Sequence, residues 1–169
     1  MTTANHPIVP LRSVVVRSAQ RGDYDRLCEL YESLDSYHRS ARPELFVKPR
    51  GRPRTLEQIT KLIEGPQSKM LVAEIAGAIV GLAVVIEREL PSHPVHRHLR
   101  HGELDELVVD AAYRRKGVAQ RLIRACEAWA RERGIASMRI GVWAFNDPAR
   151  TLYERMGYEV HTLRFGKAL

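Results

Sequence analysis

The sequence predicts a single α/β domain built on a mixed, mostly antiparallel sheet of six to seven strands flanked by four helices. Two observations support this fold class: strand-like and helix-like patterns alternate along the chain, and a hairpin signal at Ala76 and Gly77 is followed by a strand–helix–strand unit at 103–144. A length of 169 residues and a hydrophobic share of 44% suit one buried core. We assign the domain to residues 13–169 and expect residues 1–12 to form a flexible tail.

Local signals define the first elements. β-branched residues at 13–17 favour a first strand, and Asp23 precedes apolar residues at helical spacing, so it is predicted to cap the first helix. Residues 39–54 contain three prolines and a glycine and are predicted to form a loop. Thr55 and Gln58 match a capping box, which predicts a short second helix that ends at Gly65.

The second half of the chain continues the alternation of strands and helices. The predicted elements are a strand pair at 69–75 and 78–87, a loop at 90–102, a strand at 103–109, a helix at about 118–133, a strand at 136–144, a helix at about 147–157 and a strand at 158–163, with one more short extended segment after it. Pro148 stands at the favoured first position of its helix, and Gly134 follows the end of the helix before it.

The net charge of +7 is compatible with a nucleic-acid surface, an anionic cofactor or solubility alone. Basic residues are interspersed with Asp and Glu, which favours a solvated surface and no specific nucleic-acid partner. Cys28 and Cys126 fall in separate amphipathic patterns, as expected of packed thiols in a reducing compartment. The apolar stretch 70–86 is interrupted by Glu74 and two glycines, and no signal-peptide pattern is present, so we expect a cytoplasmic protein without a membrane partner.

A glycine-bearing turn at residues 114–119 is the most informative feature. It stands between an apolar strand pattern and a long amphipathic helix pattern, so unpaired N–H groups and the positive end of the helix dipole would meet there. Arg114, Arg115 and Lys116 add charge-assisted hydrogen bonds. The turn therefore predicts a pyrophosphate site and a nucleotide cofactor; alternatively, taken alone, it only opens a core helix.

Two motifs carry a resemblance to a known family. The stretch 107–119 resembles the acyl-CoA signature of the GNAT superfamily of N-acetyltransferases, Arg/Gln-x-x-Gly-x-Gly/Ala after a fourth strand, with Arg114, Gly117 and Ala119 at the defined positions. The stretch 146–158 is similar to the second motif of that family, Asn-x-x-Ala-x-x-Leu-Tyr-x-x-x-Gly-Phe/Tyr. Ala111 departs from the pattern, since the family often has proline there.

The resemblance implies a GNAT-like sheet and the transfer of an acetyl group from acetyl-CoA to a primary amine by direct attack in a ternary complex. It implies that the backbone of 107–109 pairs with the pantetheine arm and that the amides of 115–119 hold the pyrophosphate. The residues expected to bind acetyl-CoA are Leu107, Val108, Val109, Arg114, Arg115, Lys116, Gly117, Val118, Ala119, Asn146 and Arg150. The family commonly forms dimers, so a homodimer is one expectation; a CoA-binding sensor or interaction module without turnover is the alternative function.

Catalysis requires an acid for the leaving thiolate and a base for the amine. The resemblance implies that Tyr153 is the acid, although its place on an apolar helix face also suits a core residue. Glu103, Asp105 and Glu106 are the candidate bases, and strand alternation places Glu103 and Asp105 on the face of Leu107 and Val109, with Glu106 opposite. These acids could equally form a solvated strand end or bind a cationic amine.

The acceptor amine, on a small molecule or a protein, is expected near the loop between the first two helices. The candidates are Tyr31, Tyr37, His38, Arg42 and Phe46. The last three are similar to a His-x-x-x-Arg-Pro-x-x-Phe stretch of one subgroup, while Tyr31 could be core and Arg42 part of a turn. His93, His96, His98 and His101 lack the spacing of a helical ligand pair and any cysteine partner, so we expect no metal site there. Their loop could edge the acceptor site.

Gly117→Glu is expected to abolish binding of acetyl-CoA. Any Cβ at this position would crowd the phosphate oxygens, and a carboxylate would also repel them. Calorimetric titration with acetyl-CoA, compared with the unaltered chain, measures the effect. Retained affinity would mean that the phosphate assignment is wrong.

Overall fold

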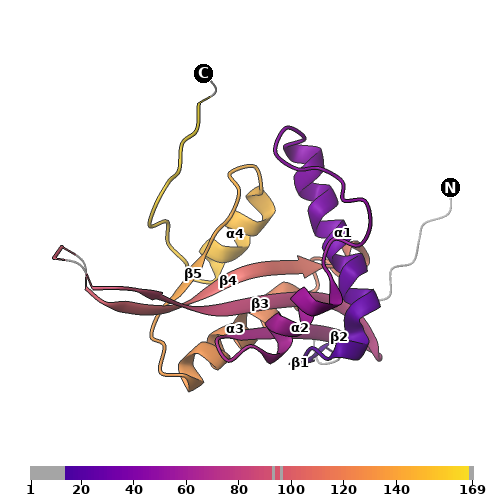
Figure 1. Cartoon of the computed structure of the whole chain (residues 1–169), viewed down its shortest axis with the longest axis horizontal. Helices are drawn as coiled ribbons and strands as arrows, with labels where there is room; N and C mark the ends of the chain where they lie inside the picture. Colours follow the sequence, from indigo (N-terminus) through magenta and orange to yellow (C-terminus); the bar gives the residue numbers. More distant parts are fainter. Residues whose placement is uncertain (1–13, 93, 96, 168–169) are drawn as a thin grey trace.

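Five strands and four α-helices make up the part of the chain that the computed structural model describes, residues 14–92, 94–95 and 97–167 (Figure 1). The strands are β1 (Val14–Ser18), β2 (Ser68–Ile75), β3 (Ala78–Leu90), β4 (Leu99–Val109) and β5 (Met138–Ile140). They form one sheet in chain order, antiparallel except for the parallel pair β4–β5. The tail predicted at 1–12 and two of the loop histidines, His93 and His96, lie outside the described residues.

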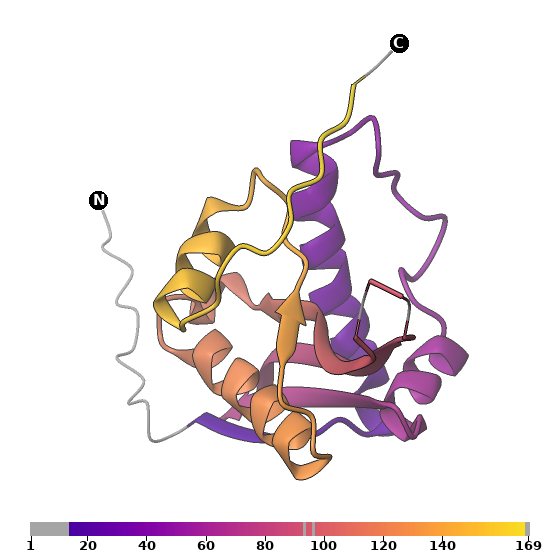
Figure 2. The same ribbon diagram turned by 90° about the vertical axis from the view of Figure 1, so that its left-hand side faces the viewer.

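Helices cover both faces of the sheet (Figures 1 and 2). α1 (Tyr24–Ala41) and α2 (Leu56–Glu64) pack on one face, α3 (Val118–Glu132) packs on the other, and α4 (Asp147–Arg155) follows β5. The α1 cluster, as we name it, contains Ala19, Leu27, Leu30, Tyr31, Ile59, Met70, Val72, Leu82, Val84 and Val108. The α3 cluster contains Val14, Leu71, Ala73, Ile75, Val80, Ala83, Val85, Leu104, Val109, Val118, Leu122, Ile123 and Cys126. Cys28 and Cys126 are buried free thiols, as predicted.

The helix starts show which capping predictions are correct. Thr55 accepts a hydrogen bond from the Gln58 N–H and Gln58 returns one to the Thr55 N–H, so the capping box is confirmed. Asp23 occupies the N-cap position of α1, but its carboxylate makes no capping bond there. It accepts instead from the Gln20 N–H and from Arg17, because a nearby guanidinium binds a carboxylate more strongly than a helix N–H does.

The predicted count of six to seven strands is wrong, since the described residues contain five. The strand predicted at 136–144 is reduced to the three residues of β5, and the strand predicted at 158–163 does not form. Both segments have strand-forming residues, but a strand also needs a hydrogen-bonded neighbour. β5 has such a neighbour on one side only, and residues 158–163 have none among the described residues.

The hairpin at Ala76 and Gly77 is confirmed, with positive φ values of 50° and 78° that suit a two-residue turn. The second predicted loop is shorter than expected, because β4 begins at Leu99 and extends the antiparallel pairing with β3. Glu87 stabilises this extension by accepting hydrogen bonds from Arg100 and from Arg133 at the end of α3.

Leu82→Ala is expected to lower the free energy of unfolding by about 2–5 kcal/mol, because Leu82 is fully buried in the central strand and its removal leaves a cavity. Leu45→Ala is the matched control, since Leu45 is 54% exposed, and it should change stability by about 0.5 kcal/mol or less. Urea unfolding followed by circular dichroism measures both. Equal losses in the two variants would contradict the packing described for the α1 cluster.

Candidate active site

The turn that precedes α3 has the backbone conformation of an anion-binding loop. Arg115 and Gly117 both have positive φ, 62° and 76°, and Gly117 is the N-cap of α3. The Arg121 N–H donates to the Gly117 carbonyl at 3.2 Å, so the N–H groups immediately before Arg121 belong to the free first turn of the helix. A left-handed non-glycine residue is uncommon and marks a turn held in place by its surroundings.

Basic side chains surround this turn. The Arg114 Nε donates to the Val109 carbonyl at 3.0 Å and so closes the turn against the end of β4. Lys116 Nζ lies 5.4 Å from the ring centre of Tyr113. Arg114 and Arg115 are exposed, so their guanidinium groups are accessible to an anion from solvent.

Arg26 of α1 anchors the same turn from the opposite side of the sheet. Its Nε donates to the Ile79 carbonyl at 2.9 Å and its Nη2 binds the Asp110 carboxylate. Asp110 also accepts from the Ala112 N–H at 3.0 Å, and the hydrogen bond from Arg26 lowers the pKa of this carboxyl. A hollow of about 480 Å³ lies beside this anchor, lined by Arg26, Gly77, Ala78, Ile79, Val80, Asp110 and Tyr113.

β4 and β5 separate shortly before the turn. Their parallel pairing joins Gly102, Glu103 and Leu104 to Met138, Arg139 and Ile140 and extends no further within the described residues. Residues 106–109 therefore pair with β3 on one side, and residues 105–109 pair with no strand of the described chain on the other. This free edge leads directly into the turn before α3. It includes Leu107, Val108 and Val109, whose backbone groups on that side could pair with an extended ligand.

A β-bulge at Asp105 changes the faces on which the acidic residues of β4 lie. Glu106 is paired with Val84 of β3 and Leu104 with Val85, so Asp105 has no cross-strand partner. The regular alternation predicted for this strand is therefore interrupted between 104 and 106.

Glu103 and Glu106 consequently share the sheet face that α1 covers. Glu103 is paired with Ile86, which packs on the α1 cluster, whereas Leu107 packs on the α3 cluster. The prediction that Glu103 and Asp105 share a face with Leu107 and Val109, opposite Glu106, is wrong for Glu103, because the bulge shifts the strand by one residue and reverses the faces before it. Asp105 is the exposed bulge residue itself.

Glu106 is the most buried of the three acids. Its Oε1 lies 3.4 Å from Arg54 Nη2, and its Oε2 is buried without a hydrogen-bond partner among the described residues. Tyr31 is fully buried beside Glu106. No hydrogen bond of good geometry joins its hydroxyl to a described residue, but the hydroxyl and the Glu106 carboxyl lie near enough to interact. Burial raises the pKa of Glu106, and burial together with the charge of Glu106 raises the pKa of Tyr31.

Arg54 joins this acid to α1. It binds Asp35 at 3.0 Å, and its guanidinium lies 4.6 Å from the centre of the Tyr31 ring. Neither Arg54 nor Asp35 was predicted as a site residue. Asp35 could have been found from its spacing, because it lies four residues after Tyr31 and three before His38 on one helix face.

The other two acids are in more open positions. Glu103 binds Arg88 at 3.0 Å. The pKa of Asp105 is raised, because its carboxyl is partly desolvated by neighbouring groups although the residue is exposed overall, and because of the charge of Glu103. His101, on the same face of β4, is buried, and its Nδ1 has no partner among the described residues. Burial lowers its pKa, and Arg139 lowers it further. His98, in contrast, binds Glu89 on the surface.

Aromatic rings gather where the end of α1 meets the segment after β5. The rings of His38 and Phe46 stack at 5.3 Å, and Phe46 meets Trp143 edge-on at 5.4 Å. Trp143 stacks on Phe145 at 5.9 Å. Arg42 lies 6.0 Å from the Trp143 ring and binds Glu44. The structure thus brings His38, Arg42 and Phe46 together, away from the buried Tyr31. Trp143 and Phe145, which complete this group of rings, were not predicted from the sequence.

α4 carries the remaining predicted residues. Tyr153 packs on the α3 cluster with its ring 6.2 Å from that of Tyr158, and burial raises its pKa to about 12. No described residue forms a hydrogen bond with its hydroxyl. Asn146 caps α4 by accepting from the Ala149 N–H at 3.3 Å, and Arg150 binds Asp147. Asn146 and Arg150 thus have local structural roles.

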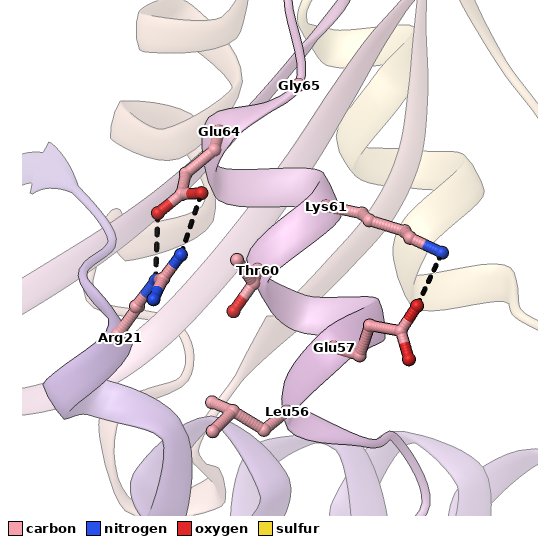
Figure 3. A pocket seen from close by; sticks show the side chains of 7 residues that line it. All are labelled: Arg21, Leu56, Glu57, Thr60, Lys61, Glu64 and Gly65. Atoms are coloured by element: carbon pink, nitrogen blue, oxygen red, sulfur yellow. Dashed lines mark hydrogen bonds and ion pairs between the residues drawn. The ribbon is translucent and has the colours of Figure 1, made fainter.

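A second hollow lies apart from all of these residues. It has a volume of about 610 Å³ and is lined by Arg21, Leu56, Glu57, Thr60, Lys61, Glu64 and Gly65 (Figure 3). Its charges are paired with each other: Arg21 binds Glu64 and Lys61 binds Glu57, both at 2.8 Å. None of the predicted site residues lines it, so we do not assign it to the site.

The described residues contain neither a cluster of metal ligands nor a membrane-spanning helix. Nowhere in them do three or more His, Cys, Asp or Glu side chains come together as metal ligands would. Likewise, no helix there combines the length and apolar character needed to cross a membrane.

Comparison with known proteins gives consistent matches. The model of the Acetyltransferase (GNAT) family matches residues 27–158. Over 151 residues the chain is 26% identical to the uncharacterized N-acetyltransferase YhfO of Bacillus subtilis (strain 168). This match covers 87% of this chain and 91% of that protein. A tetramutant of the BH1408 protein from Bacillus halodurans has a TM-score of 0.87 at 18% identity, covering 92% of this chain and 99% of the other.

A further solved structure contains a ligand. AAC(6')-Iy, in complex with the bisubstrate analogue CoA-S-monomethyl-acetylneamine, has a TM-score of 0.70 at 16% identity and covers 92% of this chain and 99% of its own. At such low identities, the two structural matches show that the fold is shared.

Arg26→Met is expected to lower the free energy of unfolding by about 1 kcal/mol at neutral pH, because Asp110 loses the guanidinium that lowers its pKa. A carboxyl with a depressed folded pKa contributes stability above its unfolded pKa of about 3.9 and loses that contribution as the pH falls through the folded pKa. The difference between the variant and the unaltered chain should therefore shrink in acid. Urea unfolding across pH measures it.

Arg52→Met is the matched control for this prediction. Arg52 also pairs with a carboxylate of α1, Asp25, but both side chains are more than half exposed. It should therefore change stability very little. A loss in Arg26→Met that did not diminish in acid would contradict the role given to its pair with Asp110.

Proposed function

Because the chain belongs to the GNAT acetyltransferase family and is therefore an acyltransferase, we propose that it transfers an acetyl group from acetyl-CoA to a primary amine in a ternary complex. One observation carries this proposal: the free edge of β4 at residues 105–109 runs directly into a turn with left-handed Arg115 and Gly117 at the start of α3. An extended thiol arm ending in a pyrophosphate has the shape and charge that such a strand edge and turn accommodate.

The donor site is built from the turn and the strand. The N–H groups at the start of α3 hold the pyrophosphate, and Arg114 and Arg115 neutralise its charge. The backbone of Leu107, Val108 and Val109 pairs with the pantetheine arm. Asn146 and Arg150 contribute to the donor site from the start and the body of α4. Asn146 does so by fixing the start of the helix that carries Tyr153. When bound, acetyl-CoA supplies the thioester carbon with which the amine nitrogen forms a bond as the carbon–sulfur bond breaks.

Glu106 is the best of the three candidate bases. It directly precedes the strand segment proposed to hold the pantetheine arm, and its buried Oε2 has no other described hydrogen-bond partner. Its raised pKa makes it a better proton acceptor than an ordinary carboxylate. Glu106 takes a proton from the acceptor ammonium, directly or through one water, and leaves a neutral amine. Glu103 is already bound to Arg88, and Asp105 is displaced by the bulge.

Tyr153 is the proposed acid. Its pKa of about 12 keeps the hydroxyl protonated at neutral pH, so it can donate to the leaving thiolate. An ammonium acceptor loses two protons on becoming an amide. Glu106 takes the first and passes it to solvent, and the second, lost once the carbon–nitrogen bond has formed, replaces the proton that Tyr153 gives to the thiolate.

The acceptor amine lies, in this proposal, on the α1 side of β4. The acids Asp35, Glu103 and Glu106 face this region, which suits an amine that arrives as a cation, and the rings of His38 and Phe46 border it. AAC(6')-Iy, with its acetylneamine-containing ligand, makes an amino-sugar a reasonable first acceptor to test. Polyamines and protein amines are the other acceptor classes.

The proposal is tested with acetyl-CoA and a panel of amines. We expect calorimetric binding of acetyl-CoA at micromolar protein concentration, and amine-dependent release of free thiol with at least one amino-sugar, polyamine or peptide. The absence of binding would refute the donor site. Tight binding without amine-dependent thiol release would instead support a CoA sensor.

The pH dependence of the rate tests the role of Glu106. A base must be deprotonated, so kcat/KM should rise as the pH climbs through the raised pKa of Glu106. Glu106→Gln should lower kcat roughly a hundredfold to ten-thousandfold and remove this limb of the profile. Glu103→Gln is the matched control on the same strand face and should retain the limb. An unchanged profile in Glu106→Gln would exclude Glu106 as the base.

A further inference from the structure

Five aromatic side chains form a continuous group, which we name the ring wall: Tyr37, His38, Phe46, Trp143 and Phe145. Neighbouring ring centres in it are 5.3–6.0 Å apart. The first three residues come from the end of α1 and the loop after it, and the last two from the segment between β5 and α4. In Figures 1 and 2 that segment rises beside the C-terminal end of α1. The ring wall therefore joins two parts of the chain that are far apart in the sequence.

The ring wall is more open than the core of the domain. Trp143 meets Phe46 edge-on and stacks on Phe145, yet it is 39% exposed, and so is Tyr37. In the core, by contrast, Tyr31 is fully buried. Rings that only attached α1 to the segment after β5 would be most stable if they closed over each other. Aromatic surface left open beside a few charged groups is typical of a ligand site.

One end of the ring wall adjoins the acids proposed to receive the amine. Asp35 precedes His38 by one helical turn, roughly 5 Å along the axis. Burial lowers the pKa of His38, and the nearby charge of Asp35 opposes this effect. Asp35 and Glu106 share the guanidinium of Arg54, at 3.0 and 3.4 Å. An amine held near these acids is therefore within one short linker of the ring wall.

These acids leave a single negative charge uncompensated. Asp35 and Glu106 carry two negative charges when ionised, and Arg54 contributes one positive charge. Farther along β4, two acids and two arginines cancel each other; they are Glu103, Asp105, Arg88 and Arg139. This balance suits an acceptor with one ammonium group better than a polycation.

The ring wall offers no second cation site at Trp143. Arg42 lies 6.0 Å from the centre of the Trp143 ring, and it is paired with Glu44. This pair therefore presents no free carboxylate to a second ammonium. The part of a ligand that lies on Trp143 is best accommodated if it is uncharged and flat, because it can then stack on the indole.

We propose that the acceptor is an arylalkylamine, a primary amine joined by a short aliphatic linker to an aromatic ring. This inference rests on the proposed function and specifies its acceptor. The ammonium lies by Asp35 and Glu106, and the ring stacks on the exposed surface of Trp143 and Tyr37. A two-carbon linker places the nitrogen roughly 5 Å from the ring centre, similar to the helical turn between Asp35 and the ring wall. Trp143 thus determines acceptor specificity.

Matched amines test this acceptor class. The compounds 2-phenylethylamine and 2-cyclohexylethylamine have the same linker and amine, and only the first has a flat ring. At saturating acetyl-CoA, kcat/KM should be roughly three- to tenfold higher for 2-phenylethylamine. It should also exceed the values for spermidine and glucosamine, roughly tenfold or more, because neither has a ring that stacks. Thiol release that is as fast with any of the other three amines would overturn the inference and leave acetyl transfer standing.

Substitution of Trp143 tests which residue selects the ring. Trp143→Ala should raise KM for 2-phenylethylamine about tenfold, leave kcat similar and remove the preference over the cyclohexyl analogue. Trp143→Phe keeps a ring and should keep the preference. Val15→Ala is the control, because Val15 is a 57% exposed residue of β1, at the far edge of the sheet, and it should change neither value. A preference that survives Trp143→Ala would overturn the role of the ring wall.

Affinity for acetyl-CoA reports whether each variant is folded. If Trp143→Ala loses that affinity, Tyr37→Ala, at another exposed part of the ring wall, provides the same test of the preference.

Calorimetry distinguishes a failure of this inference from a failure of the proposed function. We expect 2-phenylethylamine to bind the CoA-loaded protein, and to bind Trp143→Ala about tenfold more weakly. If no amine releases thiol, the proposed function fails, whether or not this binding is seen. If thiol is released but 2-phenylethylamine does not bind, only the arylalkylamine assignment is overturned.

Discussion

The short parallel pairing between β4 and β5 is the constraint on which the rest of the structure depends. The two strands are joined only at Gly102, Glu103 and Leu104, and they separate where β4 still has five residues to run. Four of those residues, 106–109, are held by β3 on one backbone edge, and their other edge is free to pair with a ligand. A longer ladder would have satisfied the same backbone groups internally and closed the proposed donor site.

The bulge at Asp105 occurs at the point where the strands part, and it determines the electrostatics of the site. Without it, Glu103 and Glu106 would lie on opposite faces of the sheet. With it, both lie on the face that α1 covers, and Glu106 pairs with Arg54, whose guanidinium lies over the Tyr31 ring. Glu106 Oε2 is buried without a hydrogen-bond partner among the described residues, which costs folding free energy. Such buried, perturbed groups are common at functional sites.

The sequence predicted much of this arrangement because the relevant signals are local. The turn at 114–119, the hairpin and the capping box each depend on a few neighbouring residues, and all form as expected. The bulge could not be foreseen, because it depends on how β4 registers with a distant strand. Two strand predictions were wrong for a related reason: β5 is shorter than the predicted strand at 136–144, and no strand forms at 158–163. Strand propensity is local, but a strand exists only with a partner. Arg54 lies in a proline-rich loop that has no periodic pattern, so its contact with Glu106 could not be predicted from the sequence.

The strained turn is held from several directions before any ligand arrives. A left-handed Arg115 costs about 1–2 kcal/mol, and it persists because its neighbours are fixed. Arg114 binds the end of β4, and Asp110, just before the turn, is tied to α1 through Arg26 and to the next residues through the Ala112 N–H. Because the backbone is ordered in advance, the pyrophosphate proposed to bind here would not have to meet that entropic cost, and more of its interaction energy would remain available to position the thioester.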